Sequence, residues 1–191
     1  MALVTDDHLY CALVYIFDAQ KRAIQGVGFL THRSGLIVTC SHVLFSAISK
    51  VKDRSDKPPV ADMFFQFYQD RYELGDKAPV RRADILGDWL PYTKGDVIIG
   101  QYKGTYPKGV TPLPLGKPDM IGSVTQTNHF RTVGFSNWGG FEAVVAEGTI
   151  LSSKNRTKNG FDVILLDDKS RTIVQGFSGA PVLNINSGHV I

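Results

Sequence analysis

The sequence has few cysteines, no long apolar run and no recognisable leader. Its 191 residues include two cysteines, Cys11 and Cys40, which lie far apart in the chain, so we expect no disulfide. Residues 1–7 lack the basic segment, apolar core and small-residue cleavage site of a signal peptide. No apolar run approaches the ~18 residues that a membrane span requires. These absences predict a protein of the reducing cytoplasm that does not cross a membrane.

Neither sign of charge is in large excess, with 21 basic and 18 acidic residues. The net charge is +3, and the local clusters Arg81 with Arg82 and residues 154–158 are interpreted as solvated loop or edge charges. We therefore expect no nucleic-acid partner. None of the five histidines has metal-ligand spacing with another histidine or a cysteine, so neither a metal nor a cofactor is expected. A composition of 43% hydrophobic and 20% charged residues is typical of a globular chain with a sizeable core.

The segment of residues 176–182 carries a serine between glycines, directly ahead of an expected strand. Gly176 and Gly179 flank Ser178 and allow the backbone to bend without a Cβ clash. Such a bend can direct neighbouring N–H groups at one point, which is how main chain forms an oxyanion hole. We interpret Ser178 as a candidate nucleophile and the N–H groups of Gly176 and Ser178 as a candidate oxyanion hole. Taken alone the pattern is weak, because glycine and serine are common in ordinary turns.

Two further segments strengthen this interpretation. His42 follows the apolar residues 35–38, and Asp96 opens the apolar run of residues 97–99. An imidazole can accept the serine proton and pass it to a leaving amine, while a carboxylate fixes the imidazole tautomer. His42 is therefore the candidate general base and Asp96 the candidate acid that orients it.

Several residues compete for these roles. Asp84 and Asp88 are alternatives for the acid, but Asp96 is favoured because it leads directly into an apolar strand. Ser136 follows a glycine and a phenylalanine as Ser178 does, but the residues after it do not continue the pattern, so we regard it as a decoy. Cys40, two residues before His42, is interpreted as a buried small hydrophobe and not as a nucleophile.

These segments, in the order His42, Asp96 and Ser178, resemble the chymotrypsin family of serine proteases, and most closely its bacterial HtrA-type branch. Residues 26–30 and 112–116 also fit that branch. The resemblance implies an all-β fold of two packed six-stranded antiparallel barrels, the second incomplete at the C-terminus. It predicts an N-terminal barrel at residues 1–103 with His42 and Asp96, a connection at 104–118, and a C-terminal barrel at 119–191 with Ser178.

The resemblance also has consequences for specificity and control. It implies that Thr172, six residues before Ser178, forms the floor of the primary specificity pocket. Phe177 stands where digestive relatives have the aspartate that binds a new N-terminus, so activation by N-terminal processing is not expected. The family has further strands and a helix after the nucleophile, so we expect another domain or chain to complete the second barrel.

Hydrophobic alternation and turn residues predict many short strands and one short helix. The helix is expected at residues 41–48 with Ser41 as a possible N-cap, and residues 71–79 are expected to form a polar turn. The expected strands are residues 9–17, 26–31, 36–40, 60–68, 80–86, 96–102, 123–126, 129–135, 143–152, 161–166, 172–174 and 181–185.

The function predicted from these observations is that of a serine endopeptidase acting on protein or peptide substrates through Ser178. We expect it to be a protease effector module of a larger, regulated intracellular bacterial protein. The alternative is a catalytically silent binding module on the same fold. An α/β-hydrolase esterase is less favoured, because that fold orders its residues serine, acid, histidine and flanks the serine as Gly-x-Ser-x-Gly.

Overall fold

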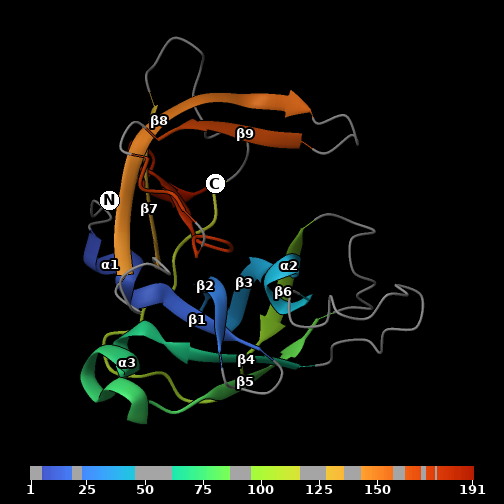
Figure 1. Ribbon diagram of the computed structural model, residues 1–191, viewed down its shortest axis with the longest axis vertical. Coiled ribbons are helices and arrows are strands. Elements are labelled where there is room, and N and C mark those ends of the chain that lie inside the picture. Colours follow the sequence, from blue (N-terminus) through green and yellow to red (C-terminus); the bar gives the residue numbers. More distant parts are fainter. Residues whose placement is uncertain are drawn as a thin grey trace, which may run out of the picture.

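The computed structural model describes residues 6–18, 23–45, 62–86, 96–116, 128–135, 143–156, 162–168, 171–174 and 176–191. Within these residues, six strands close into a barrel in the order β1-β2-β3-β6-β5-β4, and five form an open sheet in the order β11-β10-β7-β8-β9. In Figure 1 the barrel lies below and the open sheet arches above it. The all-β fold, with a first closed barrel and a second incomplete one, is confirmed.

The described strands pair antiparallel within each sheet. The barrel comprises β1 (Leu13–Phe17), β2 (Ile24–His32), β3 (Leu36–Cys40), β4 (Asp62–Phe67), β5 (Arg81–Ile85) and β6 (Val97–Gln101). The open sheet comprises β7 (Asn128–Phe135), β8 (Ala143–Arg156), β9 (Asp162–Asp167), β10 (Val182–Asn184) and β11 (His189–Val190). The helices are α1 (Asp6–Ala12), α2 (Ser41–Phe45), α3 (Tyr68–Leu74) and a 3₁₀ turn at Gly75–Lys77. The strand expected at residues 123–126 lies outside the described residues.

The first expected strand was predicted too long. Residues 9–12 belong to helix α1, and only Leu13–Phe17 is extended. Leu9 and Ala12 are fully buried, and their spacing of three residues matches one face of a helix. An apolar run of this length suits a strand and a buried helix equally, which is why periodicity did not separate them.

The polar turn expected at residues 71–79 is also wrong in its first part, where helix α3 continues directly from β4. Tyr68 and Tyr72 stack one helical turn apart with ring centroids 6.1 Å apart. Asp70 points inward and pairs with Arg81, the first residue of β5. The helix ends where Gly75 takes a positive φ of 59°. The Asp70–Arg81 pair and the contact of the Tyr68 ring with the Tyr10 ring of α1 therefore stabilise a helix that composition alone did not indicate.

The short strand expected at residues 172–174 is irregular in the structure. Arg171 has a positive φ of 55°, and Ile173 donates its N–H to Asp168 Oδ2 at 2.7 Å. A side chain thus takes the backbone donor that a neighbouring strand would need, which prevents regular pairing here.

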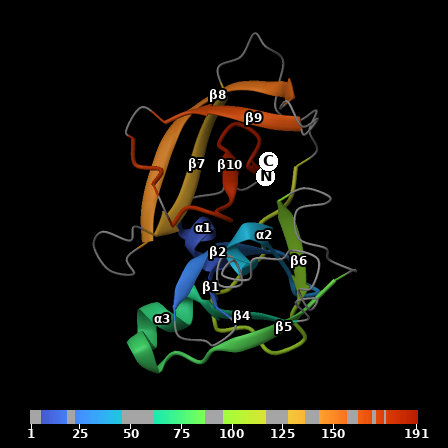
Figure 2. The ribbon, with the colours of Figure 1, turned by 45° about the vertical axis from the view of Figure 1, so that its right-hand side comes forward.

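One apolar core joins the barrel to the open sheet. It includes Tyr15 from β1 and Phe135 from β7, whose rings meet edge to face with centroids 6.1 Å apart. The irregular segment before residue 116 contacts both sheets, because Leu113 donates to the Leu30 carbonyl at 2.9 Å and Gly116 donates to the Val190 carbonyl at 2.7 Å. Figure 2 shows the open sheet seated over the barrel.

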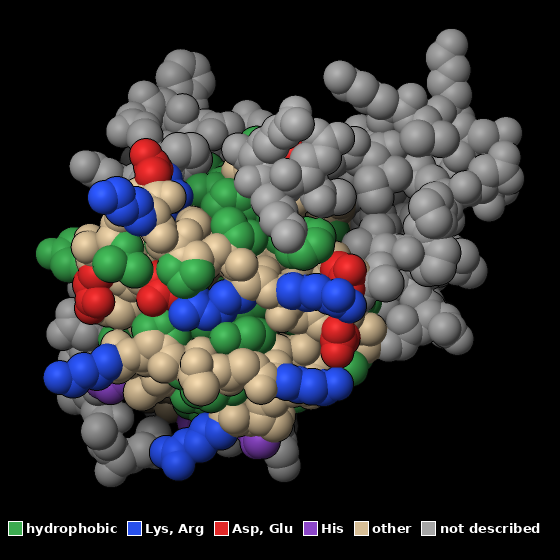
Figure 3. Space-filling view, turned by 90° about the horizontal axis from the view of Figure 1, so that it is seen from below, with side chains coloured by type: hydrophobic (Ala, Val, Ile, Leu, Met, Phe, Trp, Pro, Cys, Tyr) green, Lys and Arg blue, Asp and Glu red, His purple; other side chains and the backbone are tan. Residues whose placement is uncertain are grey.

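The underside of the barrel carries charges of both signs, which lie side by side in Figure 3. Arg82 pairs with Asp62 at 2.8 Å and Lys103 pairs with Asp84 at 3.2 Å on this exposed surface. Exposed pairs of this kind contribute little to stability.

Among the described helices, none has the length and apolar character needed to cross a bilayer.

Candidate active site

Strand register brings His42 and Asp96 together. In the antiparallel pair of β3 and β6, Cys40 lies opposite Val97. Asp96 directly precedes Val97, and α2 begins one residue after Cys40, so both side chains emerge at the same end of the two strands. The Ser41 N–H donates to the Asp96 carbonyl at 3.1 Å and closes this corner.

Three nitrogen and oxygen donors bind the Asp96 carboxylate, and the Cys40 thiol also hydrogen-bonds to it. His42 Nδ1 lies 2.5 Å from Asp96 Oδ2. The other oxygen, Oδ1, accepts from the His42 backbone N–H at 2.9 Å and from Ser41 Oγ at 2.7 Å. With Asp96 ionised, Nδ1 carries the proton, so the free lone pair of the His42 ring is on Nε2. This is the tautomer that a general base facing a serine requires.

Hydrogen bonding decides the charge state of Asp96. Burial acts to raise the pKa of Asp96, but the hydrogen bonds from Ser41 and His42, with the charge of His42, lower it below its ordinary value. The carboxylate therefore stays ionised around neutral pH. The His42 and Asp96 side chains are 42% and 49% exposed, so water screens their interaction more than in a closed site.

Asp84, one of the two alternative acids, pairs with other residues and not with His42. Asp84 pairs with Arg82 and Lys103 on the outer surface of β5. Asp88 and the decoy serine, Ser136, lie outside the described residues. Among the described carboxylates, Asp96 is the one hydrogen-bonded to the His42 ring.

Ser178 lies on a tight turn between two glycines with positive φ. The φ angles of Gly176 and Gly179 are 112° and 85°, values that favour glycine. The turn is fixed to the barrel, because Val27 of β2 donates its N–H to the Ser178 carbonyl at 3.0 Å. A Cβ at Gly179 would overlap the Val27 carbonyl oxygen and Thr39 Oγ1. The turn that carries the candidate nucleophile Ser178 therefore docks on the first barrel.

Phe177 anchors this turn from the other side. Its side chain is 7% exposed and packs directly over the backbone of Gly134 in β7, where a Cβ would collide with the ring. The residue before the serine is thus a hydrophobic anchor of the turn.

Two N–H groups of the turn are available to a ligand. The backbone N–H groups of Gly176 and Ser178 have no hydrogen-bond acceptor among the described residues. Within the same part of the chain, no hydrogen bond joins Ser178 Oγ to the His42 ring. In structures without substrate the nucleophile and base often lie outside hydrogen-bond distance, and they approach when substrate binds.

Cys40 contacts both Asp96 and the Gly179 backbone of the Ser178 turn. Its Sγ, a ring nitrogen of His42 and a carboxylate oxygen of Asp96 lie within 4.8 Å of one another. Burial and the Asp96 charge raise the pKa of the Cys40 thiol to about 11, although the Gly179 N–H partly offsets them. The thiol therefore keeps its proton at neutral pH, and this residue is neither a nucleophile nor a prepared metal ligand.

Thr172 is half-buried on the irregular segment that precedes the nucleophile turn. Asp168, an acid near it in sequence, accepts the N–H of Ile173.

The sequence did not reveal Val27 and Ser41 as contacts of the site: Val27 belongs to an ordinary apolar strand, and Ser41 was expected only as a possible N-cap. Instead of capping, the Ser41 hydroxyl donates to Asp96.

Comparisons with known proteins decide the family. Residues 26–191 match the trypsin-like peptidase domain. The chain belongs to the trypsin-like peptidase family. No curated protein matches the sequence. The crystal structure of the serine endoprotease from Yersinia pestis is similar in fold, with a TM-score of 0.56 and 16% identity. The alignment covers 99% of this chain and 57% of that one, so this chain spans little more than half the length of its structural relative.

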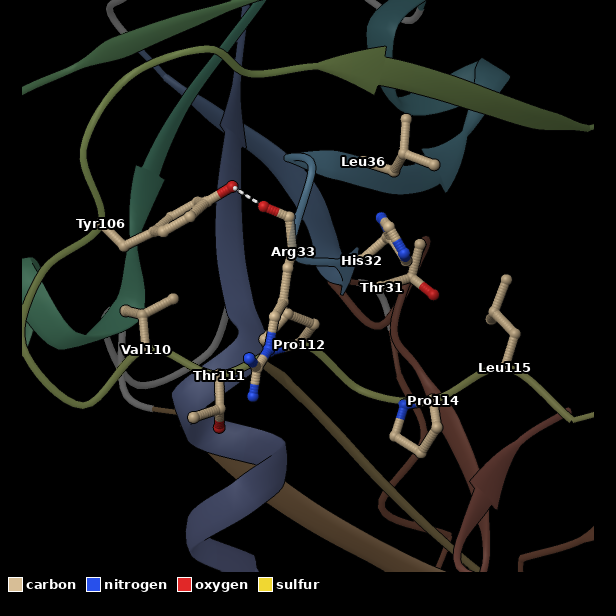
Figure 4. A pocket seen from close by; sticks show the side chains of 10 residues that line it. All are labelled: Thr31, His32, Arg33, Leu36, Tyr106, Val110, Thr111, Pro112, Pro114 and Leu115. Carbon is tan, nitrogen blue, oxygen red and sulfur yellow. Dashed lines mark hydrogen bonds between the residues drawn. The ribbon is translucent and has the colours of Figure 1, made fainter.

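One hollow in the described part of this trypsin-like peptidase lies away from His42. It has a volume of about 930 Å³ and is lined by residues of the barrel and of the segment before residue 116, as Figure 4 shows. Leu36, at the beginning of β3, borders it, whereas Cys40, next to the candidate site, ends the same strand. Four residues of extended chain separate the two by ~13 Å. We therefore assign no catalytic role to this hollow.

The docking of the nucleophile turn predicts an unequal effect of two glycine substitutions. Gly179 and Gly109 have similar φ angles, 85° and 87°, but a Cβ at Gly109 would meet no atom within 4 Å. Gly109→Ala should cost only the backbone strain of ~1 kcal/mol. Gly179→Ala adds the overlap with Val27 and should cost ~3 kcal/mol in the free energy of unfolding. Urea titrations of both variants test this, and equal losses would contradict the docking.

Proposed function

We propose that this chain is a serine endopeptidase that forms an acyl-enzyme on Ser178. His42 serves as general base and then general acid, Asp96 orients His42, and the N–H groups of Gly176 and Ser178 stabilise the oxyanion. The observation that carries the proposal is the hydrogen bond of 2.5 Å between His42 Nδ1 and Asp96 Oδ2, at the barrel end where the Ser178 turn docks. Membership of the trypsin-like peptidase family supports the same assignment.

The chemistry follows from these positions. Ser178 Oγ attacks the substrate carbonyl carbon while His42 Nε2 takes the hydroxyl proton, and the oxyanion forms near the two N–H groups. His42 then gives its proton to the leaving amine as the peptide C–N bond breaks, which leaves an ester on Ser178. Water, deprotonated by His42, attacks this ester, and His42 returns the proton to Ser178 Oγ as the acid product leaves. Asp96 stays ionised throughout and stabilises the imidazolium.

A catalytically silent binding module is the second candidate. It is supported by the half-exposed His42 and Asp96 side chains and by the missing hydrogen bond between Ser178 Oγ and His42 within the described residues. Incubation of the protein with a library of internally quenched peptides separates the two candidates. The endopeptidase proposal expects cleavage that a serine-directed inhibitor stops. A folded protein that binds library peptides without cleaving any supports the silent module.

The same library tests substrate preference. We propose Thr172 as the floor of the primary specificity pocket, which makes the pocket neutral. A buried Lys or Arg side chain without a counter-charge would lose several kcal/mol of solvation. Asp168 is engaged with the Ile173 N–H, which disfavours it as that counter-charge. We expect a small or medium apolar residue just before the cleaved bond. Strong selection for Lys or Arg would contradict the neutral pocket.

The biological setting of the proposal comes from the sequence. We infer a cytoplasmic protease module of a larger, regulated bacterial protein, with another domain or chain completing the second barrel. The proposed substrates are proteins or peptides. Among the described residues the second sheet has five strands and does not close, which supports such a completing segment, because closure removes the unpaired edges of a sheet.

A further inference from the structure

The residue before His42 contributes a contact that the catalytic roles above do not use. Ser41 has no exposed surface, and its hydroxyl donates to Asp96 Oδ1 at 2.7 Å. Its backbone N–H also donates to the Asp96 carbonyl at 3.1 Å. Ser41 thus holds both the main chain and the side chain of Asp96.

The three donors to the Asp96 carboxylate are not equivalent. Two of them, the backbone N–H and Nδ1, belong to His42, the residue that the carboxylate has to orient. A carboxylate held only by His42 could turn together with the ring and fix nothing. Among the described residues, Ser41 Oγ is the one oxygen or nitrogen donor to this carboxylate from outside His42. This bond and the weaker hydrogen bond from the Cys40 thiol therefore hold Asp96 independently of His42, and they keep Oδ2 directed at Nδ1.

Burial protects the hydrogen bond from Ser41 to Asp96 against exchange with water. The Asp96 side chain is 49% exposed, so water competes for its oxygens. Ser41, by contrast, is fully buried, and its hydroxyl has no solvent to exchange its partner for. The hydrogen bond from Ser41 also heads the contributions that oppose burial and lower the pKa of Asp96.

We propose that Ser41 is a positioning residue of this site: its hydroxyl fixes Asp96 Oδ1 so that Oδ2 faces His42 Nδ1. The inference rests on the proposed function for its effect on turnover, but the coupling of Ser41 to the His42–Asp96 pair exists whether or not Ser178 is active. The test therefore needs one readout for the coupling and one for catalysis.

The first readout is the NMR signal of the proton between His42 Nδ1 and Asp96, followed in labelled protein as the pH is lowered. In Ser41→Ala the pKa of Asp96 rises toward its ordinary value, because a donor to its ionised form is gone. The signal should then broaden and vanish at a higher pH than in the parent protein. Ser34→Ala is the matched control, since Ser34 Oγ contacts a different histidine, His32, at 2.8 Å on an exposed turn.

The second readout is steady-state cleavage of a library peptide. Ser41→Ala should lower kcat about tenfold with less than a twofold change in KM, as expected for one hydrogen bond to a charged group that acts through orientation. Ser41→Thr, which keeps the hydroxyl, should restore most of kcat, and Ser41→Cys serves if the added methyl overpacks the site. Ser34→Ala should leave kcat unchanged.

The outcomes separate the two proposals. An unchanged NMR titration in folded Ser41→Ala overturns the positioning role. An unchanged kcat in that variant does the same, provided that the parent cleaves peptides. If the parent cleaves no peptide while the NMR titration still differs between the parent and Ser41→Ala, that result contradicts the proposed function and supports the coupling of Ser41 to Asp96.

Discussion

Ser178→Ala is expected to abolish peptide-bond cleavage while the protein stays folded. Loss of the nucleophile of a serine–histidine–aspartate site lowers turnover by ~10⁴ to 10⁶. The Ser178 side chain is half-buried. Alanine keeps the main-chain hydrogen bond from the Val27 N–H to the residue-178 carbonyl, and it leaves the positive φ of Gly179 unchanged. Cleavage of a quenched peptide and thermal unfolding of both proteins measure the two effects.

Ser136→Ala is the control for this substitution, because Ser136 follows a glycine and a phenylalanine in the same way as Ser178. Its variant should cleave within twofold of the parent. Equal activity of Ser178→Ala and the parent would remove Ser178 from the mechanism, and loss of activity in Ser136→Ala alone would transfer the role to Ser136.

Asp96→Asn is expected to lower kcat by ~10³ to 10⁴ with the fold intact. Asparagine can keep a carbonyl oxygen at the Oδ1 position, where Ser41 Oγ and the His42 N–H both need an acceptor. Its NH₂ group then faces His42 Nδ1 and donates to it, so the ring proton moves to Nε2. In that tautomer Nε2 has no lone pair for the serine proton. Steady-state kinetics of the variant measure the loss.

Asp84→Asn is the matched control, since Asp84 carries the same charge but pairs with Lys103 on the exposed barrel surface. It should retain kcat within twofold, and a larger loss than in Asp96→Asn would move the acid to Asp84.

The stability of the protein provides a second signature of Asp96. The lowered pKa of Asp96 means that its ionised form stabilises the fold above the pKa of the unfolded chain, and that this contribution is lost as the pH falls through the folded pKa. The stability difference between the parent and Asp96→Asn should therefore shrink in acid.

Local sequence predicted the strands of the barrel well where alternation and turn residues agreed. The strand at Leu36–Cys40 has the predicted bounds, and a turn around Gly35 precedes it. The two missed helices have a common cause. Leu9 in α1 and Asp70 in α3 are buried by distant partners, and contacts of that kind override local propensity.

For the candidate site, the sequence predicted which residues take part but not how they are arranged. Residue type and order singled out His42, Asp96 and Ser178, because few side chains can perform that chemistry. Their arrangement depends on strand register and on contacts between the sheets, such as the Val27 N–H with the Ser178 carbonyl, which no local pattern encodes. The role of Ser41 was missed for this reason: its partner Asp96 is 55 residues away in sequence.

The most direct test of the account is the reaction of the folded protein with a fluorophosphonate, followed by mass spectrometry of its peptides. Such probes phosphonylate a serine hydroxyl that an adjacent base activates, so they report the nucleophile without requiring a known substrate. The account predicts one adduct, on Ser178, which is absent from His42→Ala and slow to form in Asp96→Asn. No adduct on the folded parent, or an adduct on Ser178 that forms equally fast without His42, would contradict it.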